Sequence, residues 1–394
     1  MSLNSTPSGE RLHIAFFGLR NAGKSSLVNA VTNQKLSVVS DVPGTTTDPV
    51  KKAMELLPLG PVLIIDTPGF DDEGTLGALR VETTRRVLAQ ADIAVLVLDS
   101  AKGKTAVDEE LLSLFRERKL PFVIAYNKAD TLQARPPLGE NALYTSALTG
   151  ENIEALKNAI GALCTEKQEE KYLVRDLLSP GGTALLVIPI DKAAPKGRLI
   201  LPQQQVMRDL LDGGIAFVTC RETELAQTLD AMKTPPQLVI TDSQVFSRVA
   251  ALVPESVPLT SFSILFARYK GNLFQLLDGA NALSRLQDGD TVLISEGCTH
   301  HRQCGDIGTE KMPAWIKRYT QKNVRFAFTS GGDFPEDLSP FALVVHCGGC
   351  MLNEREMRSR LERAAAQGVP VVNYGMAIAE MHGILKRSVE VITG

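Results

Sequence analysis

The segment GLRNAGKS, residues 18–25, lies between a short apolar run, Leu12–Phe17, and a stretch with the periodicity of a helix. A strand, a glycine-rich turn and a helix in this order are typical of a P-loop, in which backbone N–H groups surround phosphate oxygens. We expect Lys24 to reach the β- and γ-phosphates and the Ser25 hydroxyl to bind Mg²⁺. This segment therefore predicts an α/β domain in the first part of the chain.

Three further apolar runs, Val62–Asp66, Ile93–Asp99 and Phe122–Asn127, alternate with longer stretches of helical periodicity. Such alternation predicts a parallel sheet that helices cover on both faces. In sheets of this kind ligands bind at the carboxyl ends of the strands. The polar motifs of this chain stand at those ends.

Asp66–Gly69 (DTPG) ends the first of these three runs, and we expect Asp66 to hold Mg²⁺ and the Gly69 amide to sense the γ-phosphate. Asn127–Asp130 (NKAD) resembles the guanine-specifying motif of GTPases, whose Asp carboxylate accepts from N1 and the exocyclic amine of the base. ATP offers no such pair of donors. Thr145–Ala147 (TSA) fits the last GTPase motif, whose backbone amide meets the guanine O6.

The motifs therefore predict a site for GTP or GDP with Mg²⁺. The residues expected to contact the nucleotide are Gly18, Gly23, Lys24, Ser25, Ser26, Thr46, Asp66, Gly69, Asn127, Lys128, Asp130, Ser146 and Ala147. Those expected to hold Mg²⁺ are Ser25, Thr46 and Asp66, and those expected to support hydrolysis are Lys24, Asn21 and Thr46.

The finer pattern resembles the Era and TrmE branch of GTPases, in the segments DVPGTTTD, residues 41–48, and DTPGF, residues 66–70. The resemblance implies that Thr46 closes on Mg²⁺, whereas Thr47 departs from the arginine usual at its position. Phe70 replaces the water-orienting glutamine of Ras-like enzymes, so we expect slow intrinsic hydrolysis. Asn21 matches an asparagine that helps hold K⁺ in potassium-activated members. The alternative is a loop asparagine that bonds its own backbone.

At ~150 residues per domain, a chain of 394 residues has two or three domains. The breaker cluster Ser179–Gly182 ends the first, and we predict a P-loop GTPase domain at 10–165, a small α/β dimerisation domain at 180–261 and a Rossmann-like α/β cluster-binding domain at 262–394. The small middle sheet would leave open edges, so we expect a homodimer. The strands expected in the last two domains are Thr183–Ile190, Ile215–Thr219, Gln237–Thr241, Thr291–Ser295, Val324–Phe328, Phe341–Val345 and Val371–Tyr374.

Two groups of cysteine and histidine follow expected strands of the last domain. Cys298–His300 (CTH) comes after Thr291–Ser295, and His346–Cys350 (HCGGC) comes after Phe341–Val345. Parallel strands would bring both groups to one crevice. Three thiolates with an imidazole suit Zn²⁺, and three thiolates with a replaceable fourth ligand suit a [4Fe–4S] cluster. The spacing by itself does not choose between the two metals.

CxH followed by HCxxC, behind a GTPase domain of this branch and a small middle domain, resembles the HydF family of GTPases, which mature [FeFe]-hydrogenases. The resemblance implies that Cys298, Cys347 and Cys350 hold a [4Fe–4S] cluster and that the chain serves as scaffold or carrier for the two-iron subcluster. His346, His300 or an exogenous group would be the fourth ligand, with Cys304 as a further option. The implied partners are two radical-SAM maturases and the apo-[FeFe]-hydrogenase.

The composition limits the other classes of function. The net charge of −3 gives no basic field for nucleic acid or an anionic membrane, and no apolar run approaches the ~18 residues of a spanning helix. The first ten residues lack the apolar core of a secretory signal, which favours the cytoplasm. The rival interpretation is an RNA-associated GTPase of the Era or TrmE type with a structural Cys/His zinc module.

Overall fold

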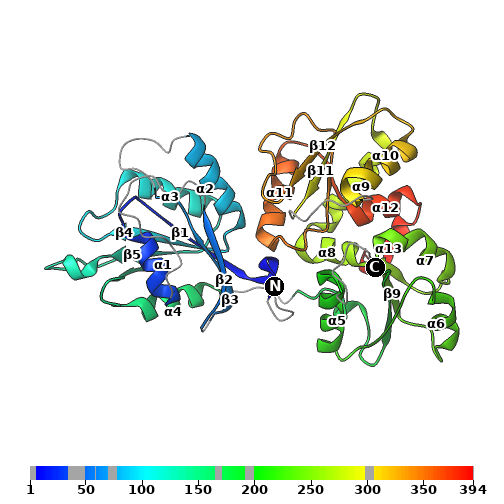
Figure 1. The fold of residues 1–394 in the computed structure, drawn as a ribbon, viewed down its shortest axis with the longest axis horizontal. Coiled ribbons are helices and arrows are strands. Elements are labelled where there is room, and N and C mark those ends of the chain that lie inside the picture. The colour runs from blue at the N-terminus through cyan, green and yellow to red at the C-terminus, as the bar shows by residue number, and fades with distance from the viewer. Residues whose placement is uncertain are drawn as a thin grey trace. The chain divides into compact units, whose positions relative to one another are not determined.

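The computed structural model describes residues 6–33, 49–57, 59–69, 78–164, 171–190, 199–297 and 306–393. The chain divides into two compact units, Met1–Glu169 and Glu170–Gly394. Both alternate strands with helices, so the predicted α/β class is confirmed (Figure 1). No helix among the described ranges is long and apolar enough to cross a membrane.

The first unit is built on a six-stranded sheet in the order β2-β3-β1-β4-β5-β6. Neighbouring strands are parallel except β2 and β3, which are antiparallel. The bounds are β1 Leu12–Gly18, α1 Lys24–Thr32, β2 Val50–Leu56, β3 Gly60–Asp66, α2 Ala78–Gln90, β4 Ile93–Asp99, α3 Ala106–Glu117, β5 Phe122–Asn127, β6 Ala142–Tyr144 and α4 Ile153–Cys164.

Alternate residues of the central strands enter two separate cores, one on each face of this sheet. Ile14 and Phe16 of β1 pack into the core that contains residues of α1 and α4. Ala15 and Phe17 pack into the other core, which contains residues of α2 and α3. Because side chains alternate along a strand, a strand buried on both faces needs a continuous apolar run. This is the pattern from which β1, β3, β4 and β5 were predicted.

The predicted parallel sheet carries one antiparallel strand at its edge. β2, with the sequence VKKAMEL, runs antiparallel to β3, and four of its first five residues are exposed. An edge strand with one face in water needs no apolar run. The sequence therefore carried no strand signal there.

The second unit contains two four-stranded parallel sheets, in the orders β10-β9-β7-β8 and β12-β11-β13-β14. The bounds are β7 Thr183–Val187, α5 Leu201–Asp212, β8 Ala216–Cys220, α6 Leu225–Ala231, β9 Leu238–Thr241, α7 Phe246–Leu252, β10 Leu259–Ser261, α8 Phe262–Lys270, α9 Leu273–Ala282, β11 Thr291–Glu296, α10 Met312–Thr320, β12 Arg325–Ser330, β13 Leu343–His346, α11 Glu354–Ala366, β14 Val371–Asn373, α12 Tyr374–Met381 and α13 Leu385–Thr393.

Helix α8 packs into the cores of both sheets. Phe262, Leu265 and Phe266 contribute to a core with residues of β7 and β9, whereas Ile264 and Ala267 join the core that contains β11 and β13. The first of these sheets also has a fourth strand, β10, that the sequence did not predict. The boundary placed at 261/262 therefore stays a prediction, because the two sheets share buried residues around it.

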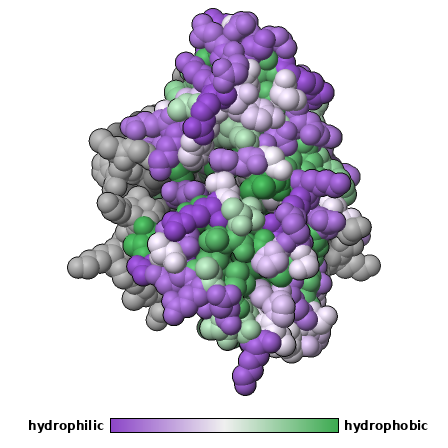
Figure 2. Space-filling view, turned by 90° about the vertical axis from the view of Figure 1, so that its right-hand side faces the viewer, coloured by the Kyte–Doolittle hydropathy of each residue, from purple (hydrophilic) through white to green (hydrophobic). Residues whose placement is uncertain are grey.

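The surface of the second unit is not uniformly polar. In Figure 2 apolar side chains gather near the centre of the visible face and polar side chains surround them. Strand β8 lies at a sheet edge, and its Val218 is 38% exposed. An open strand edge and an apolar surface patch are each typical of an interface with another chain.

Candidate functional site

Two glycines shape the loop between β1 and α1. A Cβ on Gly18 would lie 2.3 Å from the carbonyl oxygen of Val97, and one on Gly23 would lie 2.3 Å from Nδ2 of Asn127. Gly23 also has φ of 82°, in the left-handed region that glycine adopts without strain. The loop can therefore pack this closely against Val97 and Asn127 only with glycine at both positions.

Lys24 and Ser25 begin α1 directly behind this loop. Lys24 is buried, and burial lowers the pKa of its ammonium group while Asp66 opposes the shift. Ser25 Oγ donates to Asp66 Oδ2 at 2.9 Å. The other carboxylate oxygen, Oδ1, is buried without a hydrogen-bond partner. Two oxygen donors side by side, one of them an orphaned carboxylate oxygen, fit a hard cation such as Mg²⁺.

Asn127 connects the P-loop to the last nucleotide motif. Its Nδ2 donates to the carbonyl oxygens of Ala22 at 3.1 Å and Gly23 at 3.3 Å, and its Oδ1 accepts from the N–H of Ala147 at 3.0 Å. These bonds use the amide on both sides. We therefore assign Asn127 the task of fixing two loops relative to each other.

Asp130 stands at the expected base-recognition position, where its side chain is exposed. Ser146 Oγ donates to Asp130 Oδ1 at 2.5 Å, which orients the carboxylate. Lys128 adopts φ of 62°, and its ammonium group pairs with Asp99 Oδ2 at 2.7 Å. The three motif residues thus lie at one edge of the sheet, where β5 ends.

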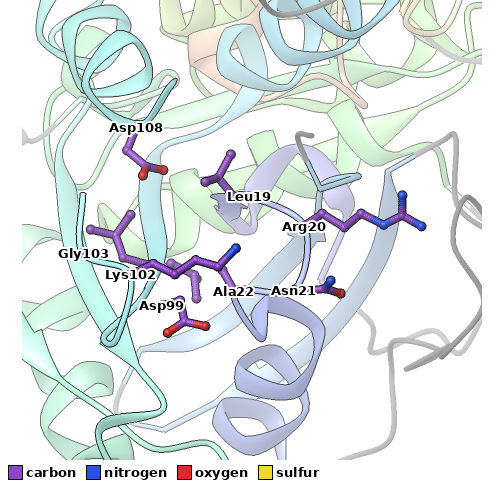
Figure 3. A pocket seen from close by; sticks show the side chains of 10 residues that line it. Leu19, Arg20, Asn21, Ala22, Asp99, Lys102, Gly103 and Asp108 are labelled. Atoms are coloured by element: carbon purple, nitrogen blue, oxygen red, sulfur yellow. The ribbon is translucent and has the colours of Figure 1, made fainter. Parts of the chain in front are cut away.

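Asn21 is exposed on the P-loop and has φ of 63°. Asparagine is enriched in this left-handed conformation, so the loop-structural alternative has a direct physical basis here. Arg20 and Asn21 project from the turn beside a pocket whose opposite wall includes Asp99 and Asp108 (Figure 3). Gly69, the last residue of the DTPG motif, lies against the P-loop turn, since a Cβ on Gly69 would be 2.9 Å from Cα of Arg20.

Two cysteines of the predicted metal site lie in the loop after β13. The Sγ of Cys347 accepts from the N–H groups of Gly297 at 3.0 Å and Gly349 at 3.4 Å. Burial raises the pKa of the Cys347 thiol to about 11 and also raises the pKa of Cys350, where Lys270 opposes the shift. Converging N–H donors and a nearby ammonium group favour sulfur as a thiolate, so this donor set fits a thiophilic metal centre once its charge displaces the protons.

His346 does not lie in the loop after the strand, as expected, but forms the last residue of β13. It is fully buried and pairs in register with Ser295 and Asn373 of the neighbouring strands. Its Nδ1 lies 2.7 Å from the carbonyl oxygen of Cys347, and its Nε2 lies 3.0 Å from Nη1 of Arg360. Both ring nitrogens are therefore engaged inside the protein.

Ser26 lies in α1, directly after Ser25. Six other predicted residues fall outside the described residues. They are Thr46, Thr47, Phe70, Cys298, His300 and Cys304. Gly297, which directly precedes Cys298 in the sequence, is described and contacts Cys347. Within the described ranges no three His, Cys, Asp or Glu side chains converge on one metal-sized point.

The sequence analysis missed two buried cations beside the cysteine loop. Lys270 of α8 donates from Nζ to the carbonyl oxygens of Cys350 at 3.2 Å and Leu352 at 2.9 Å. Arg360 of α11 contacts His346. Neither stands in a motif. The one sequence signal for them is a basic residue on an otherwise apolar helix face. Such a residue is seldom buried without a partner.

Three family models match the chain. A model described as "50S ribosome-binding GTPase" matches residues 13–128. "Hydrogen maturase F dimerization domain" matches residues 173–271, and "Hydrogen maturase F tetramerization domain" matches residues 274–391. The tetramerization description adds an assembly role to the last part of the chain that the sequence analysis did not predict.

Individual relatives cover less of the chain. The tRNA modification GTPase MnmE of Nitrosomonas europaea is 36% identical over 157 residues, 38% of this chain and 34% of that protein. MnmE of Carboxydothermus hydrogenoformans is 37% identical over 172 residues, 41% of this chain and 37% of that protein. The chain thus spans about a third of the length of these relatives. A solved structure of Era from Aquifex aeolicus is 19% identical and covers 53% of this chain and 92% of its own, with a TM-score of 0.35.

Proposed function

Because this chain belongs to the HydF-type hydrogenase maturation GTPases, we propose that it hydrolyses GTP and carries a [4Fe–4S] cluster in its last domain. The cluster domain would serve as scaffold or carrier for the two-iron subcluster of [FeFe]-hydrogenase. The observation that carries the proposal is the pair of hydrogen maturase F matches, over 173–271 and 274–391, the second of which contains a loop with the free cysteines Cys347 and Cys350.

In the proposed reaction a water molecule attacks the γ-phosphorus of GTP, the bond to the β-phosphate oxygen breaks, and GDP and phosphate leave. The Lys24 ammonium group neutralises charge that develops on the β- and γ-phosphate oxygens. Ser25 and Asp66 would hold Mg²⁺, with Thr46 as the third expected ligand, and the metal would supply further positive charge. Gly69 would sense the γ-phosphate from the edge of the P-loop.

Base recognition is assigned to the loops that follow β5 and β6, at the same edge of the sheet as the P-loop. Asp130, oriented by Ser146, would accept from N1 and the exocyclic amine of guanine. The Ala147 amide is the expected donor to O6, and it would have to exchange its bond to Asn127 Oδ1 for that contact. Asn127 holds this edge against the P-loop, and Lys128 pairs with Asp99 at the end of β4. Asn21 would contribute to a K⁺ site beside the phosphates, which supplies the cation that an arginine finger provides in other GTPases.

The cluster is assigned to the thiolates of Cys298, Cys347 and Cys350, with a replaceable fourth ligand for which His300 and His346 are the first candidates, and Cys304 or an exogenous group the others. A carrier must accept a second iron unit and later release it. An imidazole is a weaker and more readily protonated ligand than a thiolate, so it suits an exchangeable position. The cluster supplies bridging and electron-transfer chemistry when it is bound.

The proposed partners follow from this role. Two radical-SAM maturases would supply the precursor, and the apo-hydrogenase would receive it in the reducing cytoplasm, where free thiolates persist. The open edge at β8 and the apolar surface of the second unit support self-association as at least a homodimer.

Anaerobic purification followed by metal analysis tests the proposal. We expect about four irons per chain, a brown chromophore and an EPR signal after reduction. GTP turnover should proceed without added RNA. One zinc per chain with no chromophore would instead favour the rival interpretation, an RNA-associated GTPase with a structural zinc module.

A further inference from the structure

His346 occupies a position in which both ring nitrogens have partners of known chemistry. The residue is fully buried at the end of β13. A guanidinium group only donates hydrogen bonds, so Nε2 of His346 must accept from Arg360 Nη1 at 3.0 Å. The proton then resides on Nδ1, which donates to the carbonyl oxygen of Cys347 at 2.7 Å. Arg360, by donating to Nε2, thereby fixes the His346 tautomer with its proton on Nδ1.

The imidazole is neutral in this arrangement. A protonated ring would place a second cationic donor against the guanidinium group. The neutral Nδ1–H form satisfies both contacts without that repulsion.

Arg360 is itself held from several sides. Its Nη2 donates to Glu356 Oε1 at 2.7 Å and to the carbonyl oxygen of Gly331 at 2.6 Å. Its guanidinium carbon lies 5.1 Å from the centre of the Phe334 ring. Arg360 and its ion-pair partner are one helical turn apart on α11. The contacts therefore form a continuous path from α11 through Arg360 and His346 to the backbone of Cys347.

We propose that Arg360 is a positioning residue for the cluster site: it orients the neutral imidazole of His346, which holds the carbonyl group of Cys347 and does not bind iron. The inference rests on the proposed function, because it concerns the loop assigned to the cluster. Iron could bind His346 only through a lone pair on Nε2 or Nδ1. The first would leave a buried guanidinium donor unpaired, and the second would require the opposite tautomer and the loss of the bond to Cys347.

The ligand question is tested on the full-length protein, labelled with ¹⁵N-histidine and reconstituted anaerobically. Pulsed EPR of the reduced cluster detects directly bound nitrogen. We expect the nitrogen coupling pattern of His346→Gln to be the same as that of the wild type, whether or not His300 contributes a signal. Loss of a nitrogen coupling in His346→Gln would identify His346 as an iron ligand and overturn the inference.

The positioning role is tested by the rate at which a chelator removes iron. In His346→Gln the side-chain amide can accept from Arg360 and donate to Cys347, so we expect a rate within about threefold of wild type. His346→Leu and Arg360→Met break the path, and we expect each to release iron about 10- to 100-fold faster, the range typical of lost outer-shell contacts. Equal rates in Gln and Leu variants would contradict the role.

Three controls keep the outcomes separate. Arg360→Lys retains a buried donor and tests the path if Arg360→Met does not fold. Circular dichroism and thermal unfolding of each full-length variant report whether the second unit remains folded. Wild-type protein that binds no cluster after reconstitution would refute the proposed function, whereas a wild-type cluster with nitrogen from His346 would refute this inference alone.

Discussion

Lys270 Nζ donates to the carbonyl oxygen of Cys350 at 3.2 Å, although 80 residues separate the two in the sequence. Lys270 lies in the segment matched by the dimerization model and Cys350 in the segment matched by the tetramerization model. Lys270 as a whole is 4% exposed. A buried positive charge thus stands beside the loop that carries two proposed cluster ligands.

This contact predicts the effect of Lys270→Met on the proposed cluster. Removal of a cation from a low-dielectric site favours the more oxidised, less negative state of the cluster. The midpoint potential of the cluster should therefore fall by roughly some tens of millivolts, the size expected for a Coulomb interaction at an effective dielectric constant near 20. EPR-monitored redox titration measures the shift. Lys270→Arg keeps the charge and should stay close to wild type. An unchanged potential in Lys270→Met would show that the ammonium group does not influence the cluster.

Lys24→Ala should lower GTP turnover by about 10²- to 10³-fold, the usual effect of removing one fixed charge-stabilising donor. Iron content should remain that of the wild type, because Lys24 belongs to the first compact unit and the cysteine loop to the second. Phosphate release and iron analysis on the same preparation check both statements. Parallel loss of iron would contradict this division of labour between the units.

Asp130→Asn should weaken GTP binding by about 10- to 100-fold. The amide presents one acceptor where the base requires two, and hydrogen bonds to a charged carboxylate contribute more to binding than hydrogen bonds to a neutral amide. Competition between GTP and ATP in a binding assay measures the loss of guanine preference. Ser146→Ala removes only the bond that orients the carboxylate and should have a smaller effect. Unaltered selectivity in Asp130→Asn would remove Asp130 from the base site.

Replacement of Na⁺ by K⁺ should raise GTP turnover by about an order of magnitude if a missing transition-state cation limits the reaction. Asn21→Ala should erase the difference between the two salts. Asn21→Gly is the matched control for the backbone, because glycine retains the left-handed conformation of this position. Equal wild-type rates in both salts would leave Asn21 with a role in loop structure alone.

The open edge at β8 predicts self-association. Light scattering at micromolar concentration should give at least a dimer, and Val218→Lys should weaken it, since a charge on an edge strand opposes pairing. Leu148→Lys, at a position that is 85% exposed in the first unit, is the control and should leave the oligomer unchanged. A strictly monomeric wild type would contradict the interface.

Much of the first unit could be predicted because its central strands are buried on both faces. Ile93–Asp99 is an uninterrupted apolar run, and it forms β4 within the same bounds. The P-loop glycines were identifiable from the motif itself, although the atoms that exclude a Cβ at Gly18 and Gly23 belong to Val97 and Asn127, which are remote in the sequence. The apolar run and the motif can both be recognised within a few neighbouring residues.

The surroundings of the cysteine loop could not be predicted in this way. The sequence alone determined which thiols and imidazoles stand near strand ends, because strand length and residue type are local properties. Only the tertiary structure decided that β13 extends to His346 and directs this side chain toward Arg360, away from solvent. Where a strand ends depends on its pairing with neighbouring strands, and Arg360 and Lys270 reach the loop from helices whose packing the local sequence does not encode.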